Sequence, residues 1–475
     1  PINPTPASSN YPSNVEAIVQ NNCTNSGCHG EGTSLNLTSW EKMFAGSTTV
    51  GAVVVPYSNN WSHLFQHINT YTNLGLTLPA SDVMPPSPKS PLSEANVQII
   101  KDWILAGAKS QNNDYFWKDQ ETKVNNKMIA LCSGSDLVAI VDIPTNRIMR
   151  YVEVGKTPGA TGNANDAPHF IILSPDKKFF YVTLYQSGYV EKYRTDTYEF
   201  MGRVSVGTEA SLMTLNQAGT RMIITHDNET SAKPKLSLIN TDNMTVLSQI
   251  VGDGNTLARP HGLAAKSDFS MIYVSTNLGN YYGKYRVTAD QIEEVDKISF
   301  DNDPPSGTTL YGGYEIVLSG DGSKLFVSCK SKDEIRVYNT ANDSPIATIP
   351  TDDFPRLMVY DAPSNRIFVT CALATNTAVQ GSITGCIQVI DVATNTSIKK
   401  IYQVGHRPHG IRIDGVNRKL YVSSENTGGV DVPHHQPSGT NPPGKYAVID
   451  LNTLETIPSM QTDIAEFPTS LCVSN

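Results

Sequence analysis

The sequence predicts two domains of different fold class, a small all-α domain followed by a larger all-β domain of repeated four-stranded sheets. Two observations carry this prediction. Amphipathic helical patterns begin and end the segment 15–110, whereas from residue 127 onward short β-type runs recur between turn signals. A chain of 475 residues is long enough for both. We expect a flexible, proline-rich tether over 1–14, the helical domain over 15–110, a polar linker over 111–126 and the β domain over 127–475.

Composition limits the partners of this chain. A formal charge of −9 with only 17% charged residues argues against nucleic acid as the main partner. No apolar run reaches the length of a membrane span, so none is expected. The chain starts at Pro1 without a signal peptide, which is typical of a processed or trimmed sequence.

The first helix is expected to start at Ser13. Glu16 follows three residues later, which is the spacing of a capping box. Val15, Ile18 and Val19 then form one apolar stripe on a helix that leads into a cysteine-containing loop.

A second helix closes the domain. Ser93 is a candidate N-cap, Glu94 lies in the first turn and Gly107 is placed to end the helix. The apolar residues between them share one face: Val97, Ile100, Trp103 and Ile104.

The loop after the first helix has the residues of a covalent haem site. Cys23 and Cys28 can each form a thioether to a haem vinyl group, and His29 can place a ring nitrogen on the iron. Four residues separate the cysteines instead of the usual two. The alternatives are a disulfide or half of a zinc site, but no second Cys/His pair at zinc spacing lies nearby.

The sixth ligand of the iron is expected from the loop Val83-Met84-Pro85-Pro86, which is too proline-rich for regular structure. A thioether on a rigid loop is a suitable axial ligand, and Met84 is the preferred candidate. His67 is the competing ligand. His63, four residues earlier on the same helical face, is more typical of a surface or packing residue.

At this point residues 15–108 resemble the small cytochrome c domains common in Planctomycetes and Bacteroidetes. The resemblance rests on Met84-Pro85-Pro86, on Leu92-Ser93 and on the helix end Trp103-Ile104-Leu105-Ala106-Gly107-Ala108. It implies one covalent haem c. Because haem is joined to such cysteines outside the bacterial cytoplasm, it also implies a periplasmic or cell-surface protein.

The β-type runs after residue 127 repeat with a regular spacing. Alignment on the strand before each turn gives seven equivalent positions, 42 to 60 residues apart from His169 onward: His169, Ser211, His261, Tyr314, Arg356, His409 and Thr469. This period is typical of four-stranded propeller blades, so seven blades are expected. The first blade shows only three strands, and we expect residues 467–473 to complete it and close the ring. The repeats resemble the YVTN-type seven-bladed propellers, a family that includes lactonase-like and cell-surface proteins.

Propeller topology predicts a histidine-rich rim. The loops before the first strand and after the second strand of each blade share one end of the channel. This places seven histidines there: His169, His226, His261, His406, His409, His434 and His435. Arg356 and Tyr314 join the same ring, so His169, His261, His409, Arg356 and Tyr314 are the candidate catalytic residues.

Two interpretations of this rim stay open. His169, His226, His261 and His409 could hold a second metal such as copper, an arrangement similar to that of nitrous oxide reductase, a seven-bladed propeller with a histidine-bound copper cluster. Alternatively, the rings cap the inner strands through hydrogen bonds, as Pro-His-Gly segments do in YVTN propellers without a known metal. A substrate or partner site on this rim is favoured over a metal.

The propeller cysteines bear on whether the protein works in an oxidising or a reducing compartment. Cys371 and Cys386 flank one hairpin, and we expect a disulfide between them. Cys132, Cys329 and Cys472 lack such a partner and are expected to be free and buried.

Three functions are consistent with these observations. The leading hypothesis is an exported electron carrier whose propeller docks a redox partner protein. The second is a haem-containing oxidoreductase with chemistry on a small substrate at the rim, similar to the cytochrome-plus-propeller nitrite reductases, although those have eight blades and a second haem. The third is a structural or adhesive surface protein.

Overall fold

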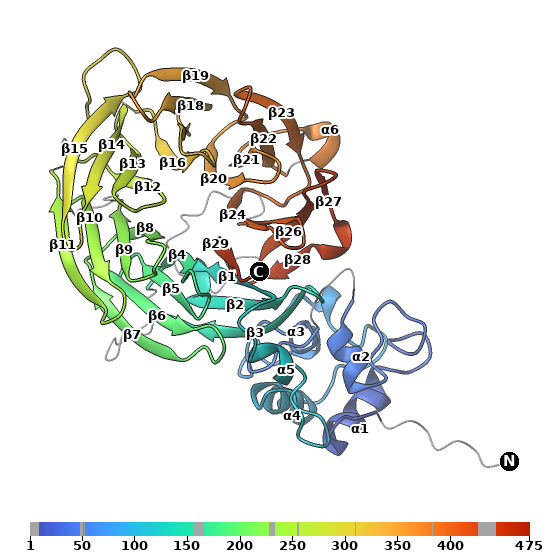
Figure 1. Cartoon of the computed structure of the whole chain (residues 1–475). Helices are drawn as coiled ribbons and strands as arrows, with labels where there is room; N and C mark the ends of the chain where they lie inside the picture. The colour runs from blue at the N-terminus through green and yellow to red at the C-terminus, as the bar shows by residue number, and fades with distance from the viewer. Residues whose placement is uncertain are drawn as a thin grey trace. The chain divides into compact units, whose positions relative to one another are not determined.

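The computed structural model describes residues 9–47, 51, 53–155, 166–227, 233–253, 256–308, 310–381, 383–425 and 443–475 (Figure 1). The chain divides into two compact units. One holds Pro1–Lys123 with Ala139–Val152 and Ser459–Asp463, and the other holds the remaining β strands. Most of the predicted tether lies outside the described residues. No helix in the described part of the chain is both long and apolar enough to span a membrane.

Short helices make up the first 123 residues. Their bounds are α1 (Ser13–Asn22), α2 (Trp40–Ala45), α3 (His63–Ile68), η1 (Ala80–Asp82), α4 (Glu94–Leu105) and α5 (Lys118–Glu121). The two predicted helices are confirmed as α1 and α4. The Ser93 side chain caps α4 by accepting a hydrogen bond from the amide of Asn96 at 3.3 Å, as expected.

The capping box predicted for α1 is wrong. Pro12 occupies the N-cap position and Ser13 is already helical. The Glu16 carboxylate instead accepts a hydrogen bond from the Ser9 hydroxyl at 2.6 Å. Proline suits this position because its fixed φ leads into a helix and the first helical amides need no intrahelical acceptor.

Helix α4 packs against both α1 and α3 through its buried apolar face, which includes Val97 and Ile104. The segment expected as a linker packs as well: the rings of Phe116 and Phe44 stack at 4.5 Å, and Trp117 is 2% exposed. Residues 111–126 therefore include ordered structure, with α5 among them, in place of a free connection.

The second predicted domain is a seven-bladed β-propeller, as expected. Each blade is one antiparallel sheet. The blades, numbered by the first of their strands along the chain, have these strands: blade 1, β1 (Lys127–Cys132), β2 (Leu137–Asp142), β3 (Arg147–Glu153) and β29 (Pro468–Val473); blade 2, β4 (Pro168–Leu173), β5 (Phe179–Leu184), β6 (Tyr189–Arg194) and β7 (Phe200–Ser205); blade 3, β8 (Ala210–Leu215), β9 (Arg221–His226), β10 (Lys235–Asn240) and β11 (Thr245–Val251); blade 4, β12 (Pro260–Ala265), β13 (Met271–Thr276), β14 (Tyr281–Val287) and β15 (Ile292–Ser299).

The other three blades follow the same order. Their strands are: blade 5, β16 (Gly313–Leu318), β17 (Lys324–Cys329), β18 (Glu334–Asn339) and β19 (Pro345–Pro350); blade 6, β20 (Pro355–Asp361), β21 (Arg366–Cys371), β22 (Cys386–Asp391) and β23 (Thr396–Ile401); blade 7, β24 (Pro408–Asp414), β25 (Lys419–Ser424), β26 (Gly444–Asp450), β27 (Glu455–Thr456) and β28 (Thr462–Ile464). Short helical turns are η2 (Ser133–Ser135), α6 (Thr377–Gln380) and η3 (Pro458–Met460).

The ring closes as the sequence predicts. The C-terminal strand β29 pairs antiparallel with β1, with Met128 opposite Val473 and Ile129 opposite Cys472. Each inner strand contacts the inner strands of the blades on either side, which completes the circle. The pairing removes the open edge that β1 and β29 would otherwise present.

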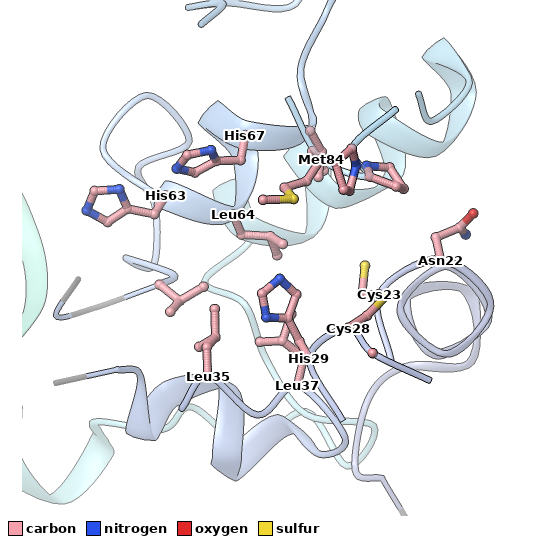
Figure 2. A pocket seen from close by; sticks show the side chains of 15 residues that line it. Asn22, Cys23, Cys28, His29, Leu35, Leu37, His63, Leu64, His67 and Met84 are labelled. Atoms are coloured by element: carbon pink, nitrogen blue, oxygen red, sulfur yellow. The ribbon is translucent and has the colours of Figure 1, made fainter. Parts of the chain in front are cut away.

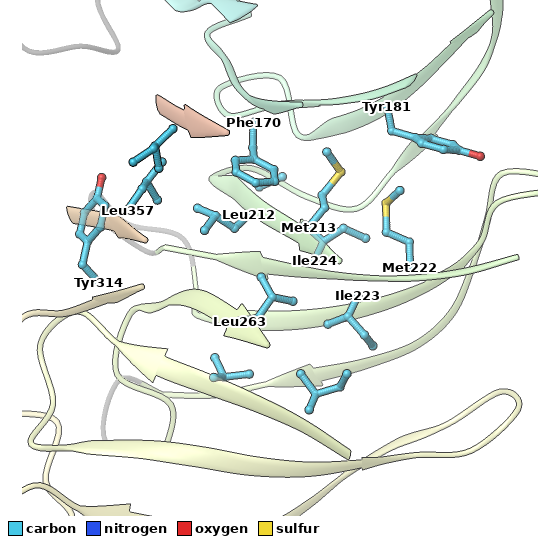
Figure 3. Close-up of a cluster of buried hydrophobic side chains, with 14 of the residues drawn as sticks. Phe170, Tyr181, Leu212, Met213, Met222, Ile223, Ile224, Leu263, Tyr314 and Leu357 are labelled. Atoms are coloured by element: carbon cyan, nitrogen blue, oxygen red, sulfur yellow. The ribbon is translucent and has the colours of Figure 1, made fainter. Parts of the chain in front are cut away.

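Apolar side chains fill the space between blades. Figure 3 shows Phe170, Leu212, Leu263 and Leu357, from the inner strands of four blades, in one cluster. Alternate residues on each strand point to opposite faces of its sheet, and both faces of the middle strands are buried, which explains near-continuous runs such as Phe179–Leu184.

The disulfide predicted in blade 6 is absent. Cys371 and Cys386 lie opposite each other in the β21–β22 register, yet both are free thiols. The Cys386 thiol donates to Asp352 Oδ2 at 3.4 Å, and the Cys371 thiol lies 3.9 Å from Gln388 Oε1. The three other propeller cysteines are free and buried, as expected: Cys132, Cys329 and Cys472.

Candidate functional site

A mainly apolar cavity of about 430 Å³ lies in the helical part of the chain. Cys23, Cys28, His29 and Met84 all line it, so the four predicted haem-binding residues converge. Figure 2 shows the His29 imidazole and the Met84 thioether directed into the same hollow, with the Cys23 sulfur beside it. The rest of the wall is largely aliphatic and prolyl: Leu35, Leu37, Val53, Leu64, Ile68, Pro85 and Pro86.

The cysteine-containing loop is held by its own backbone. The amide of Cys23 donates to the last turn of α1 at Val19, and the amide of His29 donates back to the carbonyl of Cys23 at 2.9 Å. Gly27 has a φ of 80°, which glycine adopts without strain, and this lets the longer loop close between the two cysteines. Burial raises the pKa of the Cys23 thiol to about 11, consistent with an apolar wall.

The competing histidines come from α3. His63 and His67 also line the cavity, with their rings 6.3 Å apart. Burial lowers the pKa of His63. The His67 ring is already engaged, because its Nδ1 lies 2.7 Å from the carbonyl oxygen of Asp82.

These residues fit a c-type haem by their chemistry. Within the described residues, neither the His29 ring nor the Met84 sulfur makes a hydrogen bond, although both point into the cavity (Figure 2). Met84 is 38% exposed and its side chain lines the cavity. A flat apolar group with a metal at its centre would satisfy both side chains and cover the aliphatic wall.

The propeller contains the second candidate site, and five predicted rim residues do come together there. The rings of His169 and His261 lie 6.0 Å apart, and those of His261 and Tyr314 lie 4.0 Å apart. The Tyr314 hydroxyl lies 3.1 Å from His409 Nε2. All are buried, and burial lowers the pKa of His169 to about 3 and that of His409 well below its usual range.

Arg356 belongs to a buried charge cluster at the same rim. Its guanidinium donates to Glu425 Oε1 at 2.6 Å, and Arg407 Nε lies 3.1 Å from the other Glu425 oxygen. The ammonium group of Lys330 lies 4.7 Å from the centre of the Tyr314 ring. The rim is therefore rich in cationic donors around a tyrosine and neutral histidines.

His226 does not join this group. Its ring lies inside blade 3, with Nδ1 at 3.1 Å from the Thr208 carbonyl oxygen and Nε2 at 2.9 Å from the Ser237 hydroxyl. In the part of the chain that the structure describes, no three His, Cys, Asp or Glu side chains are arranged to hold a metal ion. His434 and His435 lie outside the described residues.

Sequence comparison agrees with the propeller geometry. The model of the family described as lactonase, 7-bladed beta-propeller, matches residues 134–381, just over half of the chain. This chain belongs to that seven-bladed lactonase family.

Other similarities to this lactonase-family chain are distant. Antigen Lp49 of Leptospira interrogans is 24% identical over 176 residues, which are 34% of this chain and 36% of that protein, so the match spans about a third of the relative's length. A protein of unknown function from Desulfotomaculum acetoxidans superposes with a TM-score of 0.54 at 11% identity, over 74% of this chain and 99% of its own. A candidate 6-phosphogluconolactonase from Bacteroides fragilis gives 0.53 at 13% identity, over 74% and 98%. These structures show the shared fold alone.

Sequence reasoning missed Glu425 of this lactonase-family propeller. It directly follows β25, and the residue after the second strand of a blade reaches the same rim as the start of the first strand. Asp227, which follows β9, is placed in the same way and forms an ion pair with Arg259 at 2.5 Å. The topological rule that located the histidines would have located both carboxylates had it been applied to acidic residues.

Proposed function

We propose that this chain is an exported c-type cytochrome that exchanges electrons with a redox partner protein. One observation supports this most strongly: two thiols, an imidazole and a thioether from separate segments line a single apolar cavity. A haem bound there supplies a one-electron couple between ferric and ferrous iron.

The residues of the cavity have distinct roles in this proposal. Cys23 and Cys28 would hold the porphyrin covalently, and His29 and Met84 would supply the two protein ligands of its iron. The aliphatic wall excludes water, which disfavours the more highly charged ferric form and, together with methionine ligation, raises the reduction potential. We place the protein in the periplasm or at the cell surface, and the propeller as the platform on which the partner docks.

Covalent haem is tested by expression in the periplasm of a host with cytochrome c maturation machinery. Wild-type protein should retain haem staining after denaturing electrophoresis, and Cys28→Ala should lose one thioether by mass spectrometry. Cys472→Ala, a buried propeller cysteine, is the matched control and should stain like wild type. A wild-type protein without covalent haem would refute the proposal.

Axial ligation is tested separately. Ferric wild-type protein should show the weak near-infrared charge-transfer band of methionine ligation, and Met84→Ala should abolish it while leaving covalent haem in place. Retention of the band in Met84→Ala would exclude Met84 as the ligand.

A second candidate is oxidoreductase chemistry on a small substrate at the propeller rim. The buried set of Arg356, Arg407, Glu425, Tyr314 and His409 favours it, because such groups can orient an anion or a carbonyl compound. A copper ion bound at this rim is the less supported version of this second candidate. Elemental analysis separates these cases: one iron and no second metal per chain favours the carrier or a metal-free rim, and stoichiometric copper favours the metal site.

A further inference from the structure

The segment that carries Met84, residues 79–91, forms few backbone hydrogen bonds within itself. Prolines at positions 79, 85, 86, 88 and 91 supply no amide donors, and the internal backbone hydrogen bonds are those of Asp82 to Pro79 and of Lys89 to Pro86. Met84 is 38% exposed, so burial alone does not fix its position. Contacts from outside the segment are therefore needed to hold it.

His67 anchors the part of the segment that carries Met84. Among the described residues, the two hydrogen bonds that tie residues 79–86 to earlier parts of the chain both go to His67, whereas Lys89, further along the segment, donates to the Cys28 sulfur at 3.4 Å. The Met84 amide donates to the His67 carbonyl at 2.7 Å, and His67 Nδ1 lies 2.7 Å from the Asp82 carbonyl oxygen. A carbonyl oxygen only accepts, so Nδ1 carries the proton and donates.

The location of His67 makes it suited to this task. It lies in the last turn of α3, where helix carbonyls lack intrahelical partners, so its carbonyl is available to the Met84 amide. Its backbone and its side chain thus hold two positions of the loop, residues 82 and 84, at once. The helix that carries it packs against α4, which gives the anchor a firm base.

We infer that His67 is a positioning residue that holds the Met84 thioether over the cavity, and that it is not itself the iron ligand. This inference rests on the proposed haem function. It predicts that loss of the Nδ1 donor disturbs the position of Met84. A role as iron ligand would depend on the second ring nitrogen, Nε2.

Two substitutions separate these roles. In His67→Asn the side-chain amide nitrogen stands the same number of bonds from Cα as Nδ1 does, so the bond to Asp82 can persist while Nε2 is lost. His67→Leu removes both nitrogens at similar volume. His63→Asn and His63→Leu are matched controls on the same helix, because His63 lines the cavity and its ring makes no hydrogen bond among the described residues.

The readouts are the near-infrared methionine band, the reduction potential, and amide hydrogen exchange at Met84. His67→Leu should keep covalent haem, weaken the band, lower the potential and speed exchange at Met84 about fivefold, the factor that corresponds to loss of one hydrogen bond of about 1 kcal/mol. His67→Asn should match wild type, and both His63 variants should keep the wild-type hydrogen-exchange rate at Met84.

Two results would overturn the inference. Equal loss of axial ligation in His67→Leu and His67→Asn would make His67 the ligand, and wild-type behaviour of His67→Leu would remove its positioning role. Failure of the haem proposal is visible separately, as absence of covalent haem in the wild type. In that case hydrogen exchange at Met84 still decides whether His67 holds the loop.

Discussion

Acid should destabilise the propeller partly through one buried histidine, His226. Its neutral ring is satisfied in blade 3, where Nδ1 donates to the Thr208 carbonyl and Nε2 accepts from the Ser237 hydroxyl. Burial lowers the pKa of His226 to about 4, against about 6.5 in an unfolded chain. Between these values the unfolded chain binds a proton that the folded chain does not, so stability is lost as pH falls below about 6.5.

The magnitude follows from the two pKa values. At about pH 5 the unfolded histidine is mostly protonated and the folded one is mostly neutral, which corresponds to about 2 kcal/mol at 1.36 kcal/mol per pKa unit. His226→Asn keeps an amide donor for Thr208 and removes the titration. It should reduce the loss of unfolding free energy between about pH 8 and about pH 5 by about 2 kcal/mol relative to wild type.

Urea unfolding of both proteins at the two pH values measures this double difference. Because the change in unfolding free energy between the two pH values is compared, the pH-independent cost of the substitution itself cancels. If wild type and His226→Asn lose the same stability on acidification, His226 does not stay neutral in the folded blade and the argument from burial fails.

Three further outcomes are expected. Glu425→Ala should cost about 3–5 kcal/mol of unfolding free energy in urea, because it leaves the guanidinium of Arg356 buried without its carboxylate; a cost below about 1 kcal/mol would mean that water or another group replaces it. Thiol titration of unfolded, unreduced haem protein should find five free thiols, the seven cysteines less the two in the haem loop, whereas three would indicate a Cys371–Cys386 disulfide. Deletion of residues 468–475 should abolish cooperative unfolding of the propeller, because β1 then loses its partner, and an unchanged transition in circular dichroism would show that β29 does not close the ring.

The propeller was predictable because its signals are local and repeated. Turn residues and β-branched runs recur in every blade, and equivalent positions such as His169, His261 and His409 each occupy the second residue of an inner strand. The six-residue helix α2 was not predicted. It is too short for an apolar period to show, and it depends on packing for its stability.

The assignment of His226 to the rim shows where sequence reasoning stops. It correctly places His226 at the end of a second strand, at the level of the rim. Successive side chains of a strand alternate between the two faces of the sheet, so level along the strand does not decide where a ring points. The hydrogen bonds to Thr208 and Ser237 direct this ring into its own blade.

The two histidine-containing sites differ in whether their rings are already used by the protein. At the rim, His261 Nδ1 lies 2.8 Å from the Tyr314 carbonyl oxygen, and His409 Nδ1 lies 2.6 Å from that of Thr469. These bonds join inner strands of neighbouring blades, so the rim histidines help hold the ring together, and a metal at His409 would also have to displace the Tyr314 hydroxyl from Nε2. His29, in contrast, points an imidazole without a hydrogen-bond partner among the described residues into an apolar cavity. The His29 ring nitrogens are therefore available to a ligand, whereas the rim histidines use ring nitrogens to hold neighbouring blades together. This difference supports the proposal that the cysteine-lined cavity, and not the rim, is the centre of the redox chemistry.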